Sequence, residues 1–466
     1  MRNSLCRYLF PKPNGVGRRG RWAVAIAGVV CLILSVFTPE AAAQITKQAL
    51  IGDAVSEVGN RYADVDEAIK RFANRDFLGA RQFLESAKRK DAALPPTDLI
   101  LAKMYFMSGN APAGRASLEK TAKDNPGDPE VYFMLADDAI QNGRSIEADA
   151  LYDKGLTMNE KFSENARRKR ILEIRGRNGR SLVAERRQNW PAAASDLEAL
   201  LKQDPENATA HYRLGRALFM QKKYQEGFDQ FKAARDLDKE SIPDPYVAAG
   251  LHYDLLGDQA RARQAFDRAL AANRNDPNAL TAYGQWLIKT GEVDKAEQAL
   301  AEARKSNPES LNLLILSGVA ARMNKKMKPA EDFFMEALRI SPANGDVINQ
   351  LAQLLIEQPE QAKRERALQF ARISSQINGQ SADAHVTLAW VLYQVGLLGD
   401  AETALRKAQQ LGTFSPDSSF LIAKILMDQS KPEAAKQLLQ DALDTESQGI
   451  FVNRRDAEAL LETINR

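Results

Sequence analysis

The fold is decided by a stretch that recurs along the chain, and its clearest copy is residues 276–308, DPNALTAYGQWLIKTGEVDKAEQALAEARKSNP. Small and apolar residues recur there at the spacing of one helix face, stop at Gly291, and then recur again. The first stripe contains Leu280, Tyr283, Gly284 and Leu287, and the second contains Ala296, Leu300 and Ala303. Two amphipathic stripes separated by a glycine predict a helical hairpin.

The hairpin pattern returns about every 34 residues. Its anchor is a small residue in the first helix, and the anchors are Ala68, Ala102, Ala136, Ser181, Gly215, Gly250, Gly284, Gly318, Ala352, Ala389 and Ala423. These anchors predict about eleven units. One such hairpin is too small to bury its own apolar face, so we expect the hairpins to stack on one another in an elongated array.

Small anchors and helix-boundary residues support the hairpin interpretation. Two helices approach closely only where no large side chain intervenes, and glycine inside a helix costs roughly 1 kcal/mol relative to alanine, so the glycine anchors imply a packing benefit. Five glycines are expected to end first helices in the left-handed conformation: Gly109, Gly143, Gly257, Gly291 and Gly396. Five pairs are expected to place a capping oxygen before a first-turn proline: Asp128-Pro129, Asp204-Pro205, Asp276-Pro277, Ser341-Pro342 and Ser415-Pro416.

These residues resemble the tetratricopeptide repeat. The repeat's order of a large residue, a small one, a tyrosine-like residue, then alanine, an aromatic and a final proline is present in residues 280–308 and 314–342 and in degenerate form over roughly 60–445. The signature tryptophan of the first helix is replaced by His, Tyr or Leu. The resemblance implies an all-α fold, a right-handed superhelical solenoid that binds proteins along its concave side.

Residues 1–43 differ in composition from the rest of the chain. Arg18, Arg19 and Arg21 precede an apolar run over 22–37, and alanines at 41–43 offer a cleavage point before Gln44. This layout is typical of a secretory signal sequence, with an uncleaved N-terminal membrane anchor as the alternative. In both cases we expect the repeats to be exported, to a periplasmic or other extracytoplasmic location.

The charge and cysteine content after residue 43 exclude some classes of protein. Cys6 and Cys31 both lie within 1–43, so disulfides are not expected in the exported part. The formal charge of +3 also arises there, because residues 44–466 contain 58 basic and 60 acidic residues, a net charge of −2. This balance does not favour a nucleic-acid partner.

Two intervals depart from the repeat spacing. The 45 residues from Ala136 to Ser181 hold a basic stretch around 160–190, for which an insertion or a lengthened helix is expected. This stretch predicts either a solvated helix face or a polyanion-binding surface, carried by Arg167, Arg168, Lys169, Arg170 and Arg177. From Ala352 to Ala389 the spacing is 37, which a lengthened loop would explain. We therefore expect one continuous solenoid over 44–452, followed by a C-terminal capping helix over 453–466.

The sequence carries no catalytic or cofactor-binding pattern in a context that would support one. Gly15, Gly17 and Gly20 spell a GxGxxG, but they lie in the basic flank of residues 1–43 with no strand before them, as expected for a chance match. The three histidines, His211, His252 and His385, each fall in the first helix of a different unit and are expected to be packed there. No closely spaced His pair, Walker loop or His-Glu-x-x-His motif occurs. We expect no enzyme activity, no metal, no cofactor and no small-molecule substrate.

The inward turns of the first helices form the candidate partner-binding groove. Its predicted residues are Phe133, Tyr212, Arg216, Phe219, Leu251, Gln285, Arg322, Asn349, Gln353, Trp390 and Tyr393. Some tetratricopeptide repeats hold a peptide carboxylate with Lys and Asn on adjacent first helices, but the corresponding turns here carry Tyr212, Arg216, Val247 and Leu251. An extended or helical protein segment with apolar anchors is therefore the expected ligand.

Two functions are compatible with these features. The first is a non-catalytic scaffold that binds protein partners and assembles or positions an envelope complex, such as secretion, polysaccharide-export or surface-appendage machinery. The second is direct binding of an anionic glycan, membrane surface or other polyanion through residues 167–187 and the groove.

Overall fold

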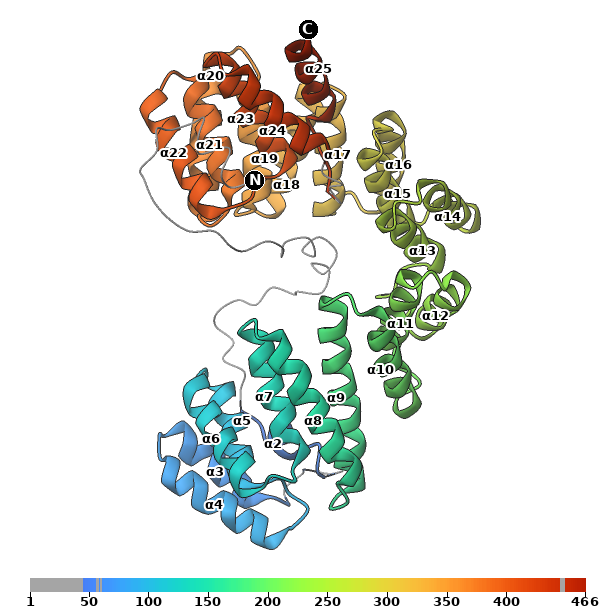
Figure 1. The fold of residues 1–466 in the computed structure, drawn as a ribbon, viewed down its shortest axis with the longest axis vertical. Coiled ribbons are helices and arrows are strands. Elements are labelled where there is room, and N and C mark those ends of the chain that lie inside the picture. Colours follow the sequence, from blue (N-terminus) through green and yellow to red (C-terminus); the bar gives the residue numbers. More distant parts are fainter. Residues whose placement is uncertain (1–44, 56–57, 59–60, 445–448) are drawn as a thin grey trace. The chain divides into compact units, whose positions relative to one another are not determined.

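The computed structural model describes residues 45–466 except 56–57, 59–60 and 445–448. These residues contain 24 helices and no strand, so the predicted all-α class is confirmed (Figure 1). None of the described helices is both long enough and apolar enough to cross a membrane. The predicted signal sequence or anchor, residues 1–43, lies outside the described part of the chain.

The chain divides into two compact units after residue 248, inside helix α13. In the first unit the helices are α2 (Lys47–Ile51), α3 (Ala63–Ala73), α4 (Phe77–Lys90), α5 (Thr97–Met107), α6 (Ala111–Asp124), α7 (Pro129–Gln141), α8 (Ser145–Lys161), α9 (Ala166–Arg186), α10 (Trp190–Gln203), α11 (Ala208–Met220) and α12 (Tyr224–Leu237). Helix α13 (Pro245–Leu255) spans the boundary.

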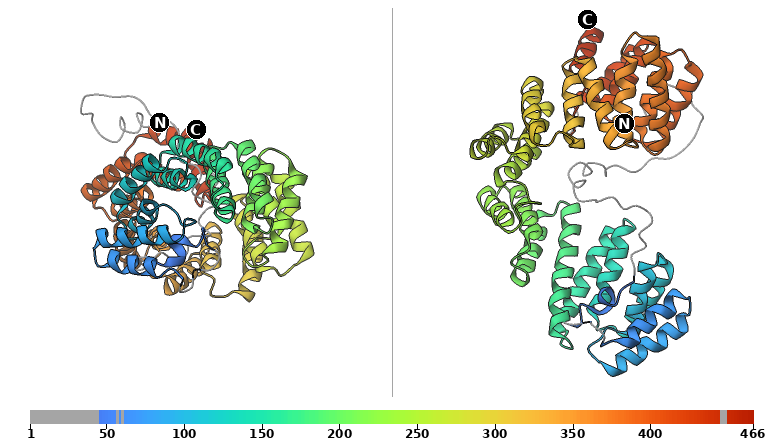
Figure 2. Two further views of the ribbon diagram at one scale, coloured as in Figure 1. Left: turned by 90° about the horizontal axis from the view of Figure 1, so that it is seen from below. Right: turned by 180° about the vertical axis from the view of Figure 1, so that it is seen from behind.

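The second unit continues the same pattern of paired helices. Its helices are α14 (Gln259–Ala272), α15 (Pro277–Lys289), α16 (Val293–Ser306), α17 (Leu311–Met323), α18 (Met327–Ile340), α19 (Gly345–Ile356), α20 (Gln361–Ile377), α21 (Ala382–Gln394), α22 (Leu398–Leu411), α23 (Pro416–Asp428), α24 (Pro432–Asp444) and α25 (Arg454–Asn465). Helices α3 to α24 form eleven consecutive hairpins, as the anchor residues predicted, and Figure 2 shows the paired helices from two further sides.

One turn type joins the two helices in ten of the eleven hairpins. All five glycines predicted to end first helices have positive φ, from 73° at Gly143 to 82° at Gly291. In five other hairpins the equivalent residue is Arg75, Gln188, Lys222, Lys325 or Ser430, again with positive φ. A single left-handed residue therefore sets the reversal of direction, and it is absent only from the α19–α20 hairpin, where the spacing is irregular.

Helix capping agrees with the prediction at three of the five proline sites. Asp128, Asp276 and Ser415 cap α7, α15 and α23, each with proline at the first helical position. At the other two sites the prediction was wrong, because Asp204 and Ser341 follow the ends of α10 and α18. There the caps are asparagines three residues later, Asn207 and Asn344, which leave the prolines in the preceding turn.

Longer helices account for both spacing irregularities. Helix α8 has 17 residues and α9 has 21, against 14 in α10 and 13 in α11. The basic stretch is therefore a lengthened helix, one of the two forms expected. The 37-residue interval comes from α20, which has 17 residues, so the predicted lengthened loop was wrong.

The small anchors lie where the two helices of a hairpin cross. A methyl group on Gly318 would lie 2.5 Å from Cε1 of Phe334, and one on Gly284 would lie 2.8 Å from Cγ of Leu300. The residue sixteen positions after an anchor is a large apolar one throughout the array, and Phe231, Phe266 and Phe334 all follow glycine anchors. The large side chain of the second helix thus occupies the space that the anchor leaves empty.

The basic helix α9 is held in a network of buried ion pairs in the first unit. Arg168 is 1% exposed and donates two hydrogen bonds to Asp128, of 2.7 and 2.8 Å, and a third of 2.8 Å to Glu130. Glu130 is fully buried and also pairs with Lys103 at 2.6 Å and Arg175 at 3.4 Å. Burial alone would raise the pKa of Glu130, but these cations lower it below its ordinary value.

Most of the neighbouring basic residues also form ion pairs or hydrogen bonds within the chain. Arg177 pairs with Glu173 and with Asp196, a carboxylate that Arg180 also holds. Lys169 donates to the carbonyl of Glu160 and Arg170 to that of Gln203. Arg167 is exposed. Most of the basic stretch therefore links α9 to its neighbours in the fold.

We predict that Gly318→Ala destabilises the second unit by about 1–3 kcal/mol, because the added methyl group would overlap the buried ring of Phe334. The control is Gly399→Ala in α22, where nothing lies within 4 Å of the added methyl group. This control should lose no stability, since alanine favours the helix. Urea unfolding followed by circular dichroism compares the two, and equal midpoints would contradict the assigned helix crossing.

We predict that Arg168→Met destabilises the first unit by about 3–5 kcal/mol, because it leaves Asp128 and Glu130 buried beside one cation fewer. The matched control, Arg167→Met, changes an exposed residue on the same helix and should stay within about 0.5 kcal/mol. Thermal melting combined with hydrogen exchange in α7 and α9 measures the difference. A variant at 168 that melts with the control would show that the network contributes no net stability.

Candidate binding groove

The predicted groove residues divide by burial. Gln285 is exposed, and five others are half-buried: Tyr212, Arg216, Leu251, Asn349 and Tyr393. The remaining five are buried: Phe133, Phe219, Arg322, Gln353 and Trp390. The buried side chains mainly pack between helices, although one of them, Trp390, also lines a hollow.

In the first unit, two predicted groove residues belong to the hairpin interior. Phe133 is fully buried, and its ring fills the space beside Gly155 and Gly176, while Phe219 lies against Tyr224. Neither ring has a surface to offer a partner in this structure. A first helix has two apolar faces, one packed against the second helix of its hairpin and one on the concave side of the array. The sequence alone does not show on which of these faces Phe133 and Phe219 lie.

Tyr212 and Arg216 lie one turn apart on α11 and remain half-buried. The ring of Tyr212 packs against Phe231, and burial raises the pKa of its hydroxyl. The guanidinium of Arg216 lies 5.4 Å from the centre of the Trp190 ring. These two side chains are the predicted groove residues of the first unit that retain some exposure.

In the second unit, Arg322 and Gln353 form a buried polar chain between first helices. Arg322 donates to Gln353 at 3.0 Å and to Glu357 at 2.9 Å, and Gln353 donates to Thr387 at 2.7 Å. These bonds join α17, α19 and α21. Asn349, also on α19, stays half-buried, and its Oδ1 accepts from Ser374 at 3.4 Å.

A hollow of about 550 Å³ lies at the ends of α19, α21 and α23. Trp390 and Lys424 line it, with the Lys424 ammonium 4.3 Å from the centre of the tryptophan ring. The Trp390 ring also stacks on Tyr393. Burial lowers the pKa of Lys424, although nearby acids such as Glu357 oppose the shift. An aromatic face beside a partly dehydrated cation suits contacts with a protein segment.

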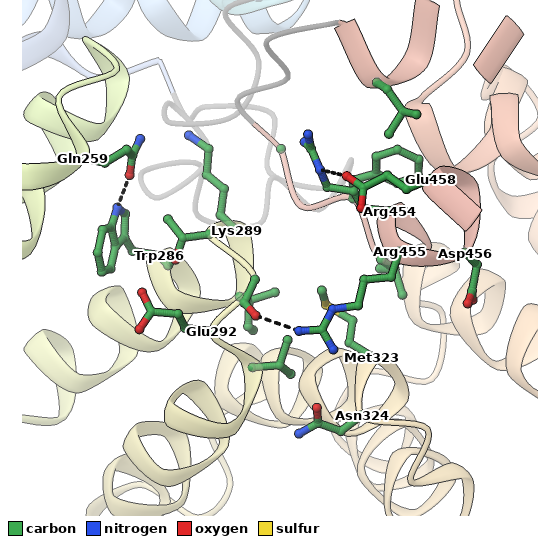
Figure 3. A pocket seen from close by; sticks show the side chains of 18 of the residues that line it. Gln259, Trp286, Lys289, Glu292, Met323, Asn324, Arg454, Arg455, Asp456 and Glu458 are labelled. Atoms are coloured by element: carbon green, nitrogen blue, oxygen red, sulfur yellow. Dashed lines mark hydrogen bonds and ion pairs between the residues drawn. The ribbon is translucent and has the colours of Figure 1, made fainter. Parts of the chain in front are cut away.

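A second hollow, of about 1110 Å³, lies between α14–α17 and residues 443–444 and 449–458 (Figure 3). On one side Trp286 donates to Gln259 at 3.0 Å, and the guanidinium of Arg263 lies 4.8 Å from the tryptophan ring. On the other side Arg455 reaches across and donates to the carbonyl of Gly291 at 3.1 Å. Figure 3 shows side chains from the two walls pointing toward one another.

The charges around this larger hollow are mixed, and most of them are paired. Arg263 pairs with Glu292, and Lys289 pairs with Asp254 at 2.7 Å. From the opposite wall, Asp456 pairs with Lys325. Arg454 pairs with Glu458, whereas Arg455 bonds to a backbone carbonyl, so the lining carries charges of both signs.

Sequence reasoning missed this second hollow. Trp286, Arg263 and Gln259 were not among the predicted residues, and residues 453–458 were expected only to cap the last hairpin. The sequence feature that could have indicated this hollow was Trp286, which follows the predicted groove residue Gln285. The part of the lining formed by residues 449–458 was not predictable, because it depends on a contact between residues more than 100 positions apart in the sequence.

Two of the three histidines make the same type of contact with a backbone carbonyl. His211 contacts the carbonyl of Pro205 at 3.0 Å and His385 that of Gly379 at 3.2 Å, six residues earlier in each case. His252 is 5% exposed. Among the described residues, no group of three or more His, Cys, Asp or Glu side chains is arranged to hold a metal ion.

Comparison with known proteins identifies the repeat. Tetratricopeptide-repeat family models match residues 179–242, 256–314 and 382–407. The chain is 28% identical over 160 residues to tetratricopeptide repeat protein 37 of Xenopus laevis, and 27% identical over 209 residues to TPR repeat-containing protein PA4667 of Pseudomonas aeruginosa. These matches span 33% and 43% of this chain, but only 10% and 34% of the two relatives.

Two further similarities cover more of the matched protein. The chain is 23% identical to the type IV pilus assembly protein PilF of Pseudomonas aeruginosa, over 46% of this chain and 82% of PilF. Yeast Tom70 aligns in structure over 86% of this chain and 95% of its own, with 16% identity and a TM-score of 0.37. On the family matches and the paired helices, the chain contains tetratricopeptide repeats, arranged as a solenoid of helical hairpins.

Proposed function

We propose that the chain is an exported scaffold that binds segments of partner proteins and so assembles or positions an envelope complex for secretion, polysaccharide export or a surface appendage. Tetratricopeptide-repeat solenoids are protein-interaction scaffolds, and that coarser role is supported by the family matches. Export is supported by the basic and apolar composition of residues 1–43. The name of the relative PilF, a pilus assembly protein, is in keeping with the proposed envelope role.

The observation that carries the proposal is the hollow around Trp390. Three successive first helices contribute to it, and its lining combines an aromatic ring, the Lys424 cation and the amide of Gln394. A short helical or extended segment with an apolar anchor matches such a lining, because the anchor covers the ring while polar groups bond at the rim.

Polyanion binding through residues 167–187 remains the alternative, with less support. Arg168 is buried, and Arg177 and Arg180 share Asp196, so these cations are already neutralised. Only the exposed members, such as Arg167, keep a surface for a glycan or lipid. The proposal includes no reaction, metal or cofactor.

We predict that a photo-crosslinking residue at Gln394 or Met427, which line the hollow, captures a protein partner in the native cell. The same residue at Ile373 or Ile377, exposed on the second helix α20, serves as the control and should capture none. Lys424→Ala should reduce capture at Gln394 several-fold by removing the cation beside Trp390. Lys407→Ala, exposed on α22, should not.

Capture confined to α20 would contradict the groove assignment. Loss of all association between low and moderate salt, with no protein captured at any position, would favour the polyanion alternative.

We predict that the chain purified from the native cell lies outside the cytoplasm and begins near Gln44, because alanines at 41–43 follow the apolar run. Cell fractionation and N-terminal sequencing test this. A chain with residues 1–43 intact in the membrane fraction would indicate the anchor alternative, and an intact chain in the cytoplasm would refute export.

A further inference from the structure

The last residues of the chain, 449–466, make contacts that a stacked cap does not require. In a solenoid each unit contacts only its neighbours, so a cap should contact α23 and α24 alone. Instead Asp456 pairs with Lys325, after α17, and Arg455 donates to Gly291, after α15. Figure 1 and the rear view in Figure 2 both show α25 beside α17. We call residues 449–466 the C-terminal segment.

The start of the C-terminal segment is fixed by one half-buried carboxylate. Asp417, in the first turn of α23, accepts the backbone N–H of Val452 at 3.1 Å and that of Asn453 at 2.8 Å. It also accepts the side-chain amide of Asn453 at 2.7 Å. Burial raises the pKa of Asp417, while these hydrogen bonds and the nearby Arg322 act in the opposite direction. Asp417 thus recognises two successive peptide groups and an asparagine.

The side chain of Asn453 bonds to Asp417 and does not cap its own helix. Asn453 occupies the N-cap position of α25 but makes no capping hydrogen bond, and its side-chain nitrogen instead donates to Asp417. Asparagine at this position ordinarily stabilises the helix that follows. Here the Asn453 side chain instead forms a contact with another helix, α23.

An apolar stripe follows at helical spacing. Ala457 is fully buried, and Leu460, Leu461 and Ile464 pack against the apolar cluster that contains Trp390 and Phe420. Leu460 also lines the hollow around Trp390. An amphipathic helix laid against an apolar face is one of the recurrent ways in which proteins recognise peptides.

The contacts of the C-terminal segment with residues 291 and 325 are weak. Lys325 and Asp456 are both largely exposed, and the contact of Arg455 is to a backbone carbonyl at the surface. Exposed ion pairs contribute little to stability and are screened by salt. The C-terminal segment is therefore held mainly at Asp417 and by its apolar stripe, and only loosely through Arg455 and Asp456.

We propose that the C-terminal segment is an internal ligand of the groove formed by α17–α23, and that a partner must displace it. The partner is a protein segment of the same chemistry. It begins with an aromatic residue equivalent to Phe451, which is buried in the apolar cluster, and has an asparagine two positions later. An amphipathic helix follows, with apolar residues in the register of Ala457, Leu460, Leu461 and Ile464. This proposal rests on the proposed function, since it names the kind of partner the groove receives.

The test uses a fluorescent peptide of residues 449–466 added to the full chain. With Asn453→Ala and Leu460→Asp in the chain, its own segment is released, and the peptide should bind at least about tenfold more tightly than to the unaltered chain. The reason is that a tethered ligand competes at a high effective concentration. Adding Asp417→Asn to the released chain should abolish this gain by removing an acceptor.

Matched controls distinguish specific binding of the peptide in the groove from nonspecific effects of the substitutions. Glu462→Ala changes an exposed residue of α25 and should leave peptide binding as in the unaltered chain. A peptide carrying the equivalent asparagine and leucine changes should bind none of the proteins. Equal binding to the unaltered and released chains, or no binding to a released chain whose circular dichroism is unchanged, would overturn the proposal.

A second measurement needs no variant. Excess unlabelled peptide should accelerate hydrogen exchange at the Val452 and Asn453 amides of the unaltered chain, because displacement frees them from Asp417. Unchanged exchange at saturating peptide would also overturn the proposal. Failure of these experiments leaves the scaffold proposal standing if Gln394 still captures a partner in cells. Peptide binding with no captured partner would instead support the internal ligand and refute the scaffold.

Discussion

The close crossing of two helices within each hairpin is the constraint on which the array depends. In the α11–α12 hairpin a methyl group on Gly215 would lie 2.9 Å from the carbonyl oxygen of Gly227, and one on Gly227 would lie 2.8 Å from that of Gly215. Backbones this close exclude any side chain between them. A large residue such as Phe231 then packs beside the crossing, and its position sixteen residues after the anchor fixes the length of the helix–turn–helix unit.

The lengthened helices α8 and α9 meet the same constraint with different chemistry. Gly155 and Gly176 face Phe133, and Gly179 faces Tyr152, so glycines still accommodate aromatic rings. Beyond the rings, however, the contact is ionic: Arg168 and Arg175 reach back to carboxylates on α7. Buried ion pairs specify geometry more than they add stability, because separating the partners leaves an uncompensated charge in the interior. This network can therefore fix the register of a long helix that apolar packing alone would define less well.

The repeat unit was predictable because its determinants are local. The hairpin at Gly284, the left-handed turn at Gly291 and the eleven-unit count all follow from spacing within 34 residues. Capping was less predictable, since Ser341-Pro342 and Ser415-Pro416 look alike in sequence but lie respectively after and before a helix. The groove was predicted only in part. Burial of Phe133 depends on which face of a first helix meets its own hairpin, and residue type alone does not indicate that.

Contacts distant in sequence explain what local patterns could not. Arg455 and Gly291 are 164 positions apart, and no periodicity in the chain connects them. Asp417 illustrates the physical consequence. Even a half-buried carboxylate is costly to desolvate, and here three hydrogen-bond donors offset that cost. If the C-terminal segment leaves, water or another segment must supply equivalent donors. The hydrogen-bond acceptors of the groove are therefore paired in two states, one in which the C-terminal segment occupies the groove and one in which a partner does. The equilibrium between these states depends on how well the partner reproduces the contacts of Asn453 and of the apolar stripe that follows it.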